Sequence, residues 1–296
     1  MAEPLRPLRG RLRDQAQRLR VPIDVVERDY ALGHVLAAIY ERDALNAALV
    51  FKGGTALKKA YFGDYRFSVD LDFTAIDGPR GDELEQEMTL LARAVESALG
   101  AHGPFAVVAS RRPEQRGHPT GQEAFRLAVQ FPWHPSPLCS IKVEITTDEP
   151  LLLPAADRAL LHGYQEELAA TLRCYTLEEI VAEKFRTMLQ AEKRLEDGKW
   201  LRNCARDYYD LWQMCATSDV VVDYAAVARI LPAKLAVRGV QAATVDDLFP
   251  ARVVEGASRQ WGSSLAALVR PLPEFEVALD ELKASLRSHL PAWQSG

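Results

Sequence analysis

The sequence predicts an α+β protein, in which a mixed β-sheet with flanking helices precedes a C-terminal helical bundle. Two segments, Arg66–Thr74 and Ser140–Thr146, alternate apolar and polar residues in the period of a β-strand. Two longer segments, 22–41 and 82–100, repeat apolar residues at helical spacing. Because strands and helices are interspersed along this part of the chain, we expect one sheet with helices packed on it.

The pattern changes after Pro150, where we expect strands to give way to helices. The simplest division is an α/β domain with N-terminal helices at residues 1–170 and a helical domain at 171–296.

The first long helix is expected over residues 22–41, where Asp24 can cap it and Glu27 can complete a capping box. The apolar run Ala47–Phe51 indicates a strand or a helix end that leads into a glycine turn. A short helix is then expected from Thr55 to Phe62.

The remaining elements follow from the same two periods. The expected strands are 66–74, 104–110, 124–131 and 140–146, with a polar loop at 111–122. The expected helices are 82–100, 176–194, 204–216, 223–231 and 274–289.

The charge balance argues against a protein that coats nucleic acid non-specifically, because the formal net charge of the 296 residues is −5. The first twenty residues nevertheless carry six arginines. A solvated arm or helix and an RNA-contacting arm both remain open for this segment.

The four cysteines are scattered, and neither a C-x-x-C pair nor a Cys/His cluster with zinc spacing is present in the sequence. Such usage is typical of a reducing compartment, so we expect a cytoplasmic protein. The sequence has no run of about 18 apolar residues, so we expect no membrane partner.

Two carboxylates carry the chemistry that the sequence predicts. Residues i and i+2 of a strand point to the same face, so Asp70 and Asp72 lie side by side. Like charges this close repel each other unless a cation neutralises them. Hard oxygen ligands suit Mg²⁺ or Mn²⁺, and a two-ion site of this kind activates an attacking oxygen and stabilises the leaving one.

Glu144 is the candidate third carboxylate, because it faces away from the apolar residues of its own strand. If its strand neighbours that of Asp70, Glu144 can bind the catalytic ion and help deprotonate an acceptor hydroxyl. Lys142 lies two residues earlier on the same face and can contact phosphate.

Gly53 and Gly54 predict a turn in which backbone N–H groups approach phosphate oxygens closely. A helix that starts at Thr55 would add a favourable partial charge. Thr55 or Ser68 can also donate a hydroxyl group to a triphosphate.

Gly53-Gly54 followed by Asp70-x-Asp72 on a strand resembles the signature of the DNA polymerase β-like nucleotidyltransferase superfamily. The resemblance extends downstream to Thr176-Leu-Glu-Glu179, Glu183-Lys184-Phe185-Arg186 and Arg206-Asp207-Tyr208-Tyr209-Asp210. With Val26-Glu27-Arg28-Asp29-Tyr30 upstream, the chain is similar to the AbiEii/AbiGii-type (MenT-like) nucleotidyltransferase toxins over about residues 22–216.

This resemblance implies roles for three further residues. Lys184 and Arg186 are expected to contact the nucleotide phosphates, and Asp207 is expected to be needed for activity. From the residues alone, Lys184 can also be a surface lysine, and Asp207 can be a helix cap. Both interpretations stay open at this stage.

The resemblance also implies an activity. Such toxins are paired with a cognate antitoxin, and some transfer a nucleoside monophosphate, often a pyrimidine, from an NTP to the 3′ end of tRNA, which blocks aminoacylation and translation. Two alternatives remain. The acceptor can be a protein or small-molecule hydroxyl, or the chain can be a catalytically silent nucleotide-binding regulatory protein.

Overall fold

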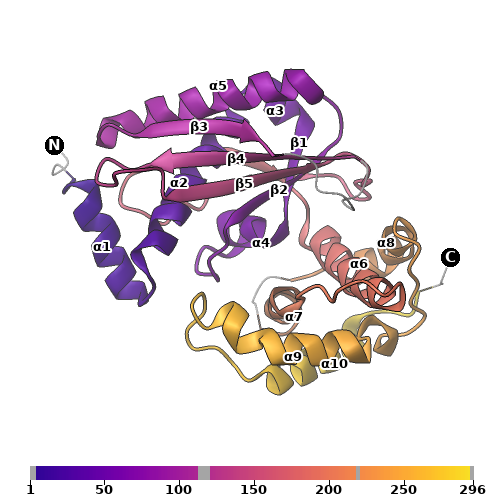
Figure 1. The fold of residues 1–296 in the computed structure, drawn as a ribbon. Coiled ribbons are helices and arrows are strands. Elements are labelled where there is room, and N and C mark those ends of the chain that lie inside the picture. Colours follow the sequence, from indigo (N-terminus) through magenta and orange to yellow (C-terminus); the bar gives the residue numbers. More distant parts are fainter. Residues whose placement is uncertain (1–4, 113–120, 218–220, 294–296) are drawn as a thin grey trace. The chain divides into compact units, whose positions relative to one another are not determined.

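A computed structural model describes residues 5–112, 121–217 and 221–293 and confirms the predicted α+β class. The chain forms two compact units, each described here by itself (Figure 1). The first unit comprises residues 1–149 and 155–174, and the second comprises residues 150–154 and 175–296.

The first unit contains a mixed sheet in which the seven strands of the described residues have the order β3-β4-β5-β2-β1-β7-β6. The pairs β2–β5 and β1–β7 are parallel, and the other neighbouring strands are antiparallel. The strands are β1 Leu49–Lys52, β2 Asp70–Ala75, β3 Ala106–Arg111, β4 Gln122–Gln130, β5 Cys139–Thr146, β6 Ala156–Ala159 and β7 Thr171–Cys174.

The two long helices of this unit, α2 and α5, pack against each other and against the sheet (Figure 1). Helix α5 buries a stripe that includes Leu84, Met88 and Leu91, whereas α2 is buried along most of its length. The helices of the unit are α1 Leu8–Leu19, α2 Ile23–Tyr40, α3 Asp43–Ala48, α4 Gly53–Ala56, η1 Leu57–Phe62, α5 Gly81–Leu99 and η2 Gly100–His102.

The second unit is helical in its described residues, as expected for this part of the chain. Helix α6 packs against α8, and α7 packs against α9 and α10. The helices are α6 Leu177–Glu196, α7 Ala205–Trp212, η3 Gln213–Thr217, α8 Tyr224–Ala236, η4 Asp246–Leu248, α9 Ala251–Leu265 and α10 Phe275–His289.

The strand predicted from Arg66 begins four residues later, at Asp70. Its neighbour β1 ends at Lys52, opposite Asp72, because the chain turns into α4 at Gly53. Asp70 and Leu71 extend β2 beyond β1 through their pairing with β5, and no such pairing is formed by the described residues 66–69. Helix α4, which follows β1, begins at Gly53, two residues before the start that was expected at Thr55.

Strands do not end at Pro150, contrary to the prediction. β6 and β7 follow it, and β7 joins the sheet beside β1, where Phe51 is in register with Cys174. Each of these strands has four residues, and β6 is largely exposed. Such short segments carry too little alternation to be recognised, and their pairing is fixed by distant parts of the chain. Helix α9 was not predicted either, whereas α1 forms within the N-terminal segment for which an arm or a helix was expected.

The capping box predicted at Asp24 is wrong, because Pro22 occupies the N-cap position and makes no side-chain cap. Glu27 instead accepts hydrogen bonds from Trp133 Nε1 and His134 Nε2, each at 2.8 Å. At α6, Thr176 occupies the N-cap position, and its side chain accepts a hydrogen bond from the Glu179 N–H at 3.3 Å. The predicted loop at 111–122 lies largely outside the described residues.

Candidate active site

The predicted carboxylates of the first unit lie on two adjacent strands. In the parallel β2–β5 pair, Asp72 is opposite Glu144, and Asp70 is opposite Lys142. The alternating residues Leu71 and Val143 are fully buried in the hydrophobic core, so the carboxylates occupy the other face of the sheet. The expectation that these two strands are neighbours is confirmed.

Glu144 is held by two partners on its own face of the sheet. Its Oε1 accepts a hydrogen bond from Gln122 Nε2 at 2.7 Å, and its Oε2 lies 2.7 Å from Lys142 Nζ. Lys142 therefore supplies a positive charge beside this carboxylate. A cation that binds Glu144 through Oε2 has to displace or share this contact.

Gly53 makes room for the carboxylate of Asp72. Its φ is +78°, and a Cβ built there would lie 2.7 Å from Asp72 Oδ2. Both the left-handed backbone and the close approach require glycine at this position. Gly54 plays the same steric part for Arg66, whose guanidinium group occupies the space that a Cβ would need. The glycine pair thus positions a carboxylate and a cation.

The hydroxyl group of Thr55 donates a hydrogen bond to the backbone carbonyl of Asp70, and the residue is fully buried. This contact connects α4 to the start of β2 and differs from the predicted contact with a triphosphate. Ser68 is half-buried in the segment that precedes β2.

A buried ion pair shares the acidic face of the sheet. Lys52 is in register with Asp72 across the β1–β2 pair, and its Nζ lies 3.3 Å from Glu149 Oε2. Both side chains are almost completely buried. Lys52 immediately precedes the two glycines in the sequence, but no pattern in the sequence indicated Glu149 as its partner.

The predicted residues of the second unit form a cluster between α6 and α7. Lys184 Nζ lies 3.0 Å from Asp207 Oδ1 and 2.7 Å from Asp210 Oδ2. Lys184 is 7% exposed, which excludes the surface-lysine interpretation. Asp207 lies in the first turn of α7 after the N-cap residue Cys204, so it is not the helix cap.

Arg202 borders this cluster, whereas Arg186 contacts residues of its own helix. Arg202 Nη2 lies 3.6 Å from Asp207 Oδ2. Arg186 is buried, donates a hydrogen bond to Gln190 at 2.9 Å, and lies 3.4 Å from Glu183.

Sequence reasoning missed the role of Asp210, which is fully buried. Its spacing of three residues from Asp207 places both carboxylates on one face of α7, and that signal was available.

The donor set of the first unit suits a hard divalent cation. Asp70, Asp72 and Glu144 offer carboxylate oxygens from one face of two paired strands, and oxygen ligands are those that Mg²⁺ and Mn²⁺ prefer. In the described structure these oxygens do not all lie within 4.8 Å of one another, so the three side chains have to draw together to share one ion.

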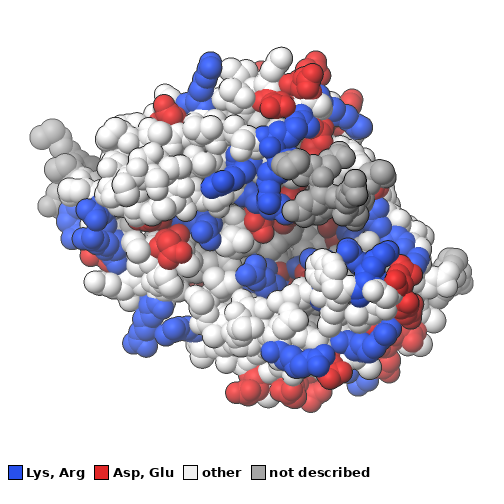
Figure 2. Space-filling view, in the orientation of Figure 1, with Lys and Arg blue, Asp and Glu red and all other residues white. Residues whose placement is uncertain are grey.

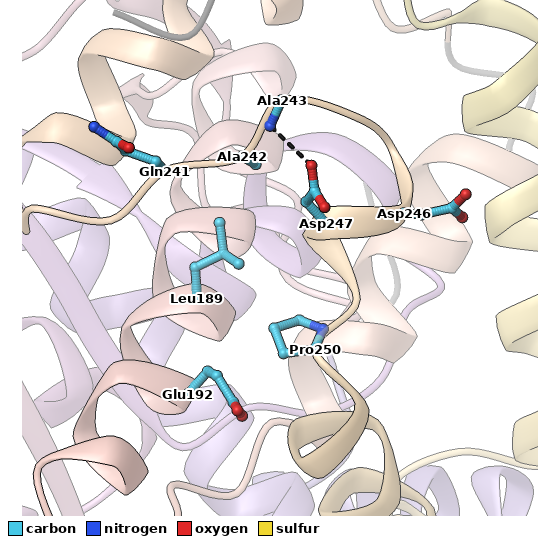
Figure 3. Close-up of a pocket in the computed structure, with 8 residues that line it drawn as sticks. All are labelled: Leu189, Glu192, Gln241, Ala242, Ala243, Asp246, Asp247 and Pro250. Atoms are coloured by element: carbon cyan, nitrogen blue, oxygen red, sulfur yellow. Dashed lines mark hydrogen bonds between the residues drawn. The ribbon is translucent and has the colours of Figure 1, made fainter.

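A surface pocket in the second unit contains none of the predicted residues (Figure 3). Its wall includes three acidic side chains, Glu192, Asp246 and Asp247. Asp247 Oδ2 accepts hydrogen bonds from the backbone N–H groups of Ala243 at 3.0 Å and Thr244 at 2.8 Å. A pocket lined with carboxylates disfavours a triphosphate, so this pocket is a poor candidate for the nucleotide site.

Basic and acidic side chains are interspersed on the face shown in Figure 2, in keeping with the net charge of −5. In the part of the chain that the structure describes, no helix is long and apolar enough to cross a membrane.

A mixed sheet with flanking helices, carrying paired aspartates on one face, is consistent with a nucleotidyltransferase fold. The chain belongs to the AbiEii family, described as the nucleotidyl transferase AbiEii toxin of type IV toxin–antitoxin systems, whose model matches residues 34–281. No curated protein matches the chain significantly. Family membership makes the protein a nucleotidyltransferase-type toxin, a class that typically uses an NTP and a divalent metal and is paired with an antitoxin.

Proposed function

We propose that this toxin transfers a nucleoside monophosphate, preferentially a pyrimidine nucleotide, from an NTP to the 3′ end of tRNA in a Mg²⁺-dependent reaction. The modified tRNA could no longer be aminoacylated, so translation would stop. The observation that carries the proposal is the register of β2 and β5, which puts Asp72 opposite Glu144 with Asp70 on the same face. Family membership supports the reaction class.

Asp70, Asp72 and Glu144 would hold Mg²⁺, or Mn²⁺ in its place, because they present three carboxylates on one sheet face. The bound ion would neutralise phosphate charge and lower the pKa of the acceptor hydroxyl. Gly53 leaves space for the carboxylate of Asp72, and Gly54 leaves space for Arg66.

The other residues orient the substrate and compensate its charge. Ser68 donates a hydroxyl to the triphosphate in this proposal, and Thr55 supports the glycine turn through the carbonyl of Asp70. Lys184 and Arg186 of the second unit contact the phosphates. Asp207 orients Lys184 through their hydrogen bond of 3.0 Å. Fixed positive charges of this kind stabilise the negative charge that develops during phosphoryl transfer.

The reaction forms one bond and breaks one bond. The acceptor hydroxyl oxygen attacks the α-phosphorus in line, and the bond from that phosphorus to the bridging oxygen of pyrophosphate breaks. The hydroxyl proton passes to Glu144 and then to solvent. Positioning and charge compensation provide most of the rate enhancement in such transfers.

The acceptor and the partner follow from family properties, so they need a direct test. Purified protein is incubated with each of the four α-labelled NTPs and Mg²⁺, in one series with total tRNA and in another with protein extract. We expect label on tRNA 3′ ends with a pyrimidine NTP, and loss of that label in Asp70→Asn and Asp72→Asn. Asp82→Asn, which changes an exposed aspartate at the start of α5, is the matched control.

Each alternative gives a different result. Label on protein instead of tRNA would identify a protein as the acceptor. Absence of transfer with all four NTPs and both acceptors would support a catalytically silent regulatory protein. If Asp72→Asn transferred label at the wild-type rate, the assignment of the catalytic site would be wrong. Relief of growth arrest on co-expression of an adjacent gene would identify the cognate antitoxin.

A further inference from the structure

A second group of potential metal ligands lies in the first unit, on residues to which the proposed reaction assigns no role. Among the described residues, His34, His102 and Glu166 are the one group of three whose ligand atoms all lie within 4.8 Å of one another. His34 belongs to α2, His102 ends η2 after α5, and Glu166 lies between β6 and β7. Three segments far apart in the sequence therefore bring nitrogen and oxygen ligands to one point.

The polar atoms of this group are buried without protein partners. Neither ring nitrogen of His34 has a hydrogen-bond partner among the described residues, although the residue is only 5% exposed. The Tyr30 hydroxyl and both ring nitrogens of His162 are in the same condition within the described chain. Burying such atoms without a partner is costly, and each one in a native protein calls for an explanation.

The carboxylate of Glu166 is contacted by residues that are not among the three candidate ligands. Arg11 of α1 donates a hydrogen bond to Oε2, while Oε1 has no hydrogen-bond partner among the described residues. His162 Nε2 lies 3.8 Å from Oε1. The Nδ1 side of His162 is closed, because it packs against Gly33 and a Cβ there would lie 2.5 Å away. A charged partner on one oxygen leaves the other oxygen to act as a monodentate ligand, which is a common arrangement around metal sites.

Histidine is a common metal ligand in proteins. A neutral imidazole keeps a lone pair on one ring nitrogen, which is the form that binds metal ions.

We propose that His34, His102 and Glu166 bind one Zn²⁺ ion. Two imidazoles with one carboxylate form a donor set that proteins use for zinc, with a water molecule in the fourth position. The site would join α2, the end of α5 and the segment before β7, and thereby stabilise the first unit.

The ligand types distinguish this site from the proposed catalytic one. Imidazole nitrogen favours Zn²⁺ and other transition-metal ions, whereas a set of carboxylates favours Mg²⁺. The zinc site therefore does not depend on the proposed reaction, and the two ions can be tested separately on one protein.

The test uses the full chain without an affinity tag. Metal-free protein is titrated with Zn²⁺ against a chromophoric chelator, and bound zinc is counted by mass spectrometry after dialysis. We expect one Zn²⁺ per chain and a rise in Tm of roughly 5 °C when Zn²⁺ is in excess. His102→Ala and Glu166→Gln should each weaken Zn²⁺ binding by about 100-fold or more. His102 is partly exposed, so its variant is expected to fold.

His289→Ala is the matched control, because His289 is an exposed histidine at the end of α10. It should bind zinc as the wild type does. Co²⁺ in place of Zn²⁺ should give intense visible d–d bands in the wild type and weak ones in His102→Ala. Unchanged Zn²⁺ affinity in both variants, or a wild-type chain that binds no zinc in the titration, would overturn the proposal. If the protein bound zinc but transferred no nucleotide, the zinc proposal would hold and only the proposed function would be wrong.

Discussion

Lys184 of α6 donates a hydrogen bond to Asp207 of α7 at 3.0 Å, and this contact orients the cation on which the proposed phosphate binding depends. Asp210, one turn further along α7, lies 2.7 Å from the same Nζ and is fully buried. Lys184 is therefore held between two carboxylates. Its ammonium group is fixed in place, which reduces the reorganisation needed when a phosphate binds.

Asp210→Asn should impair nucleotide binding and stability together. The substitution leaves a buried ammonium with one charged partner, and breaking a buried ion pair costs about 3 kcal/mol. We expect an increase in KM for the NTP of at least about tenfold, with a smaller change in kcat, measured by steady-state transfer. Asp280→Asn on an exposed position of α10 is the control. A purely structural role would lower Tm and leave the KM of the folded fraction unchanged.

Gly53→Ala should inactivate the enzyme through Asp72. The new Cβ would lie 2.7 Å from Asp72 Oδ2, so the carboxylate has to move, and displacements of about 1 Å can reduce rates by about 100-fold. Transfer activity and Mg²⁺ dependence are the measurements.

Gly81→Ala separates the steric effect on Asp72 from backbone strain. Gly81 also has a positive φ, +55°, but its Cβ would meet no atom within 4 Å. We expect this variant to lose some stability and to keep its activity. Equal losses of activity in the two variants would show that backbone strain, and not the contact with Asp72, decides the outcome.

The fold class could be predicted because its main elements have strong periods. Helix α5 and strand β5 follow their patterns closely, with one face buried along the whole element. The short strands β6 and β7 could not be predicted, since their place in the sheet depends on pairing with distant residues. The N-terminal segment forms a helix, which agrees with the solvated arm or helix expected there except at one arginine. Arg11 is buried against Glu166, because α1 packs its Leu8 and Leu12 into the core.

The three carboxylates of the candidate site could be predicted from the alternation of side chains along a β-strand. Because residues i and i+2 share a face, Asp70 and Asp72 lie together, and Glu144 lies on the corresponding face of its own strand. The partners of these residues were not predictable. Gln122, Glu149 and Arg66 reach the site through strand register and side-chain direction, which are set by tertiary packing.

The buried pair of Glu179 and Lys234 should control the stability of the second unit. Both side chains are fully buried, and their charged atoms lie 2.7 Å apart. Glu179 also accepts hydrogen bonds from the N–H groups of Leu152 and Leu153, which attach residues 150–154 to α6. Glu179→Gln should lower the free energy of unfolding by about 3 kcal/mol, because Lys234 keeps a buried charge without its counterion.

A double-mutant cycle checks this interpretation by denaturant unfolding. The variant Glu179→Gln/Lys234→Met should be more stable than the sum of its single changes predicts, since both charges are then absent. Lys199→Met is the control, because its pair with Asp197 is about half exposed and should contribute less than about 1 kcal/mol. Additive losses in the cycle would mean that the two side chains act independently.

The thiols should react slowly in the native protein and faster as the pH rises. All four cysteines are free and buried, and burial raises the pKa of each from 9.0 to about 12. The thiolate is the reactive form, and at pH 8 the thiolate fraction of a thiol with a pKa of about 12 is roughly 1,000-fold smaller than that of a thiol with a pKa of 9. A disulfide reagent should therefore titrate four thiols promptly in denaturant and few in native protein at pH 8.

The raised pKa of the thiols also determines whether the protein gains or loses stability as the pH rises. A thiol whose pKa is raised in the folded state binds its proton more tightly there, so its contribution to stability is complete below pH 9 and is lost as the pH rises toward 12. Cys215→Ala should therefore reduce the alkaline loss of stability of the second unit, measured by denaturant unfolding at pH 8 and pH 10. Cys215 is fully buried, and burial is the main cause of its raised pKa. If a native thiol instead reacted at pH 8 at the rate of an unfolded one, its segment would have to open readily, contrary to its buried position.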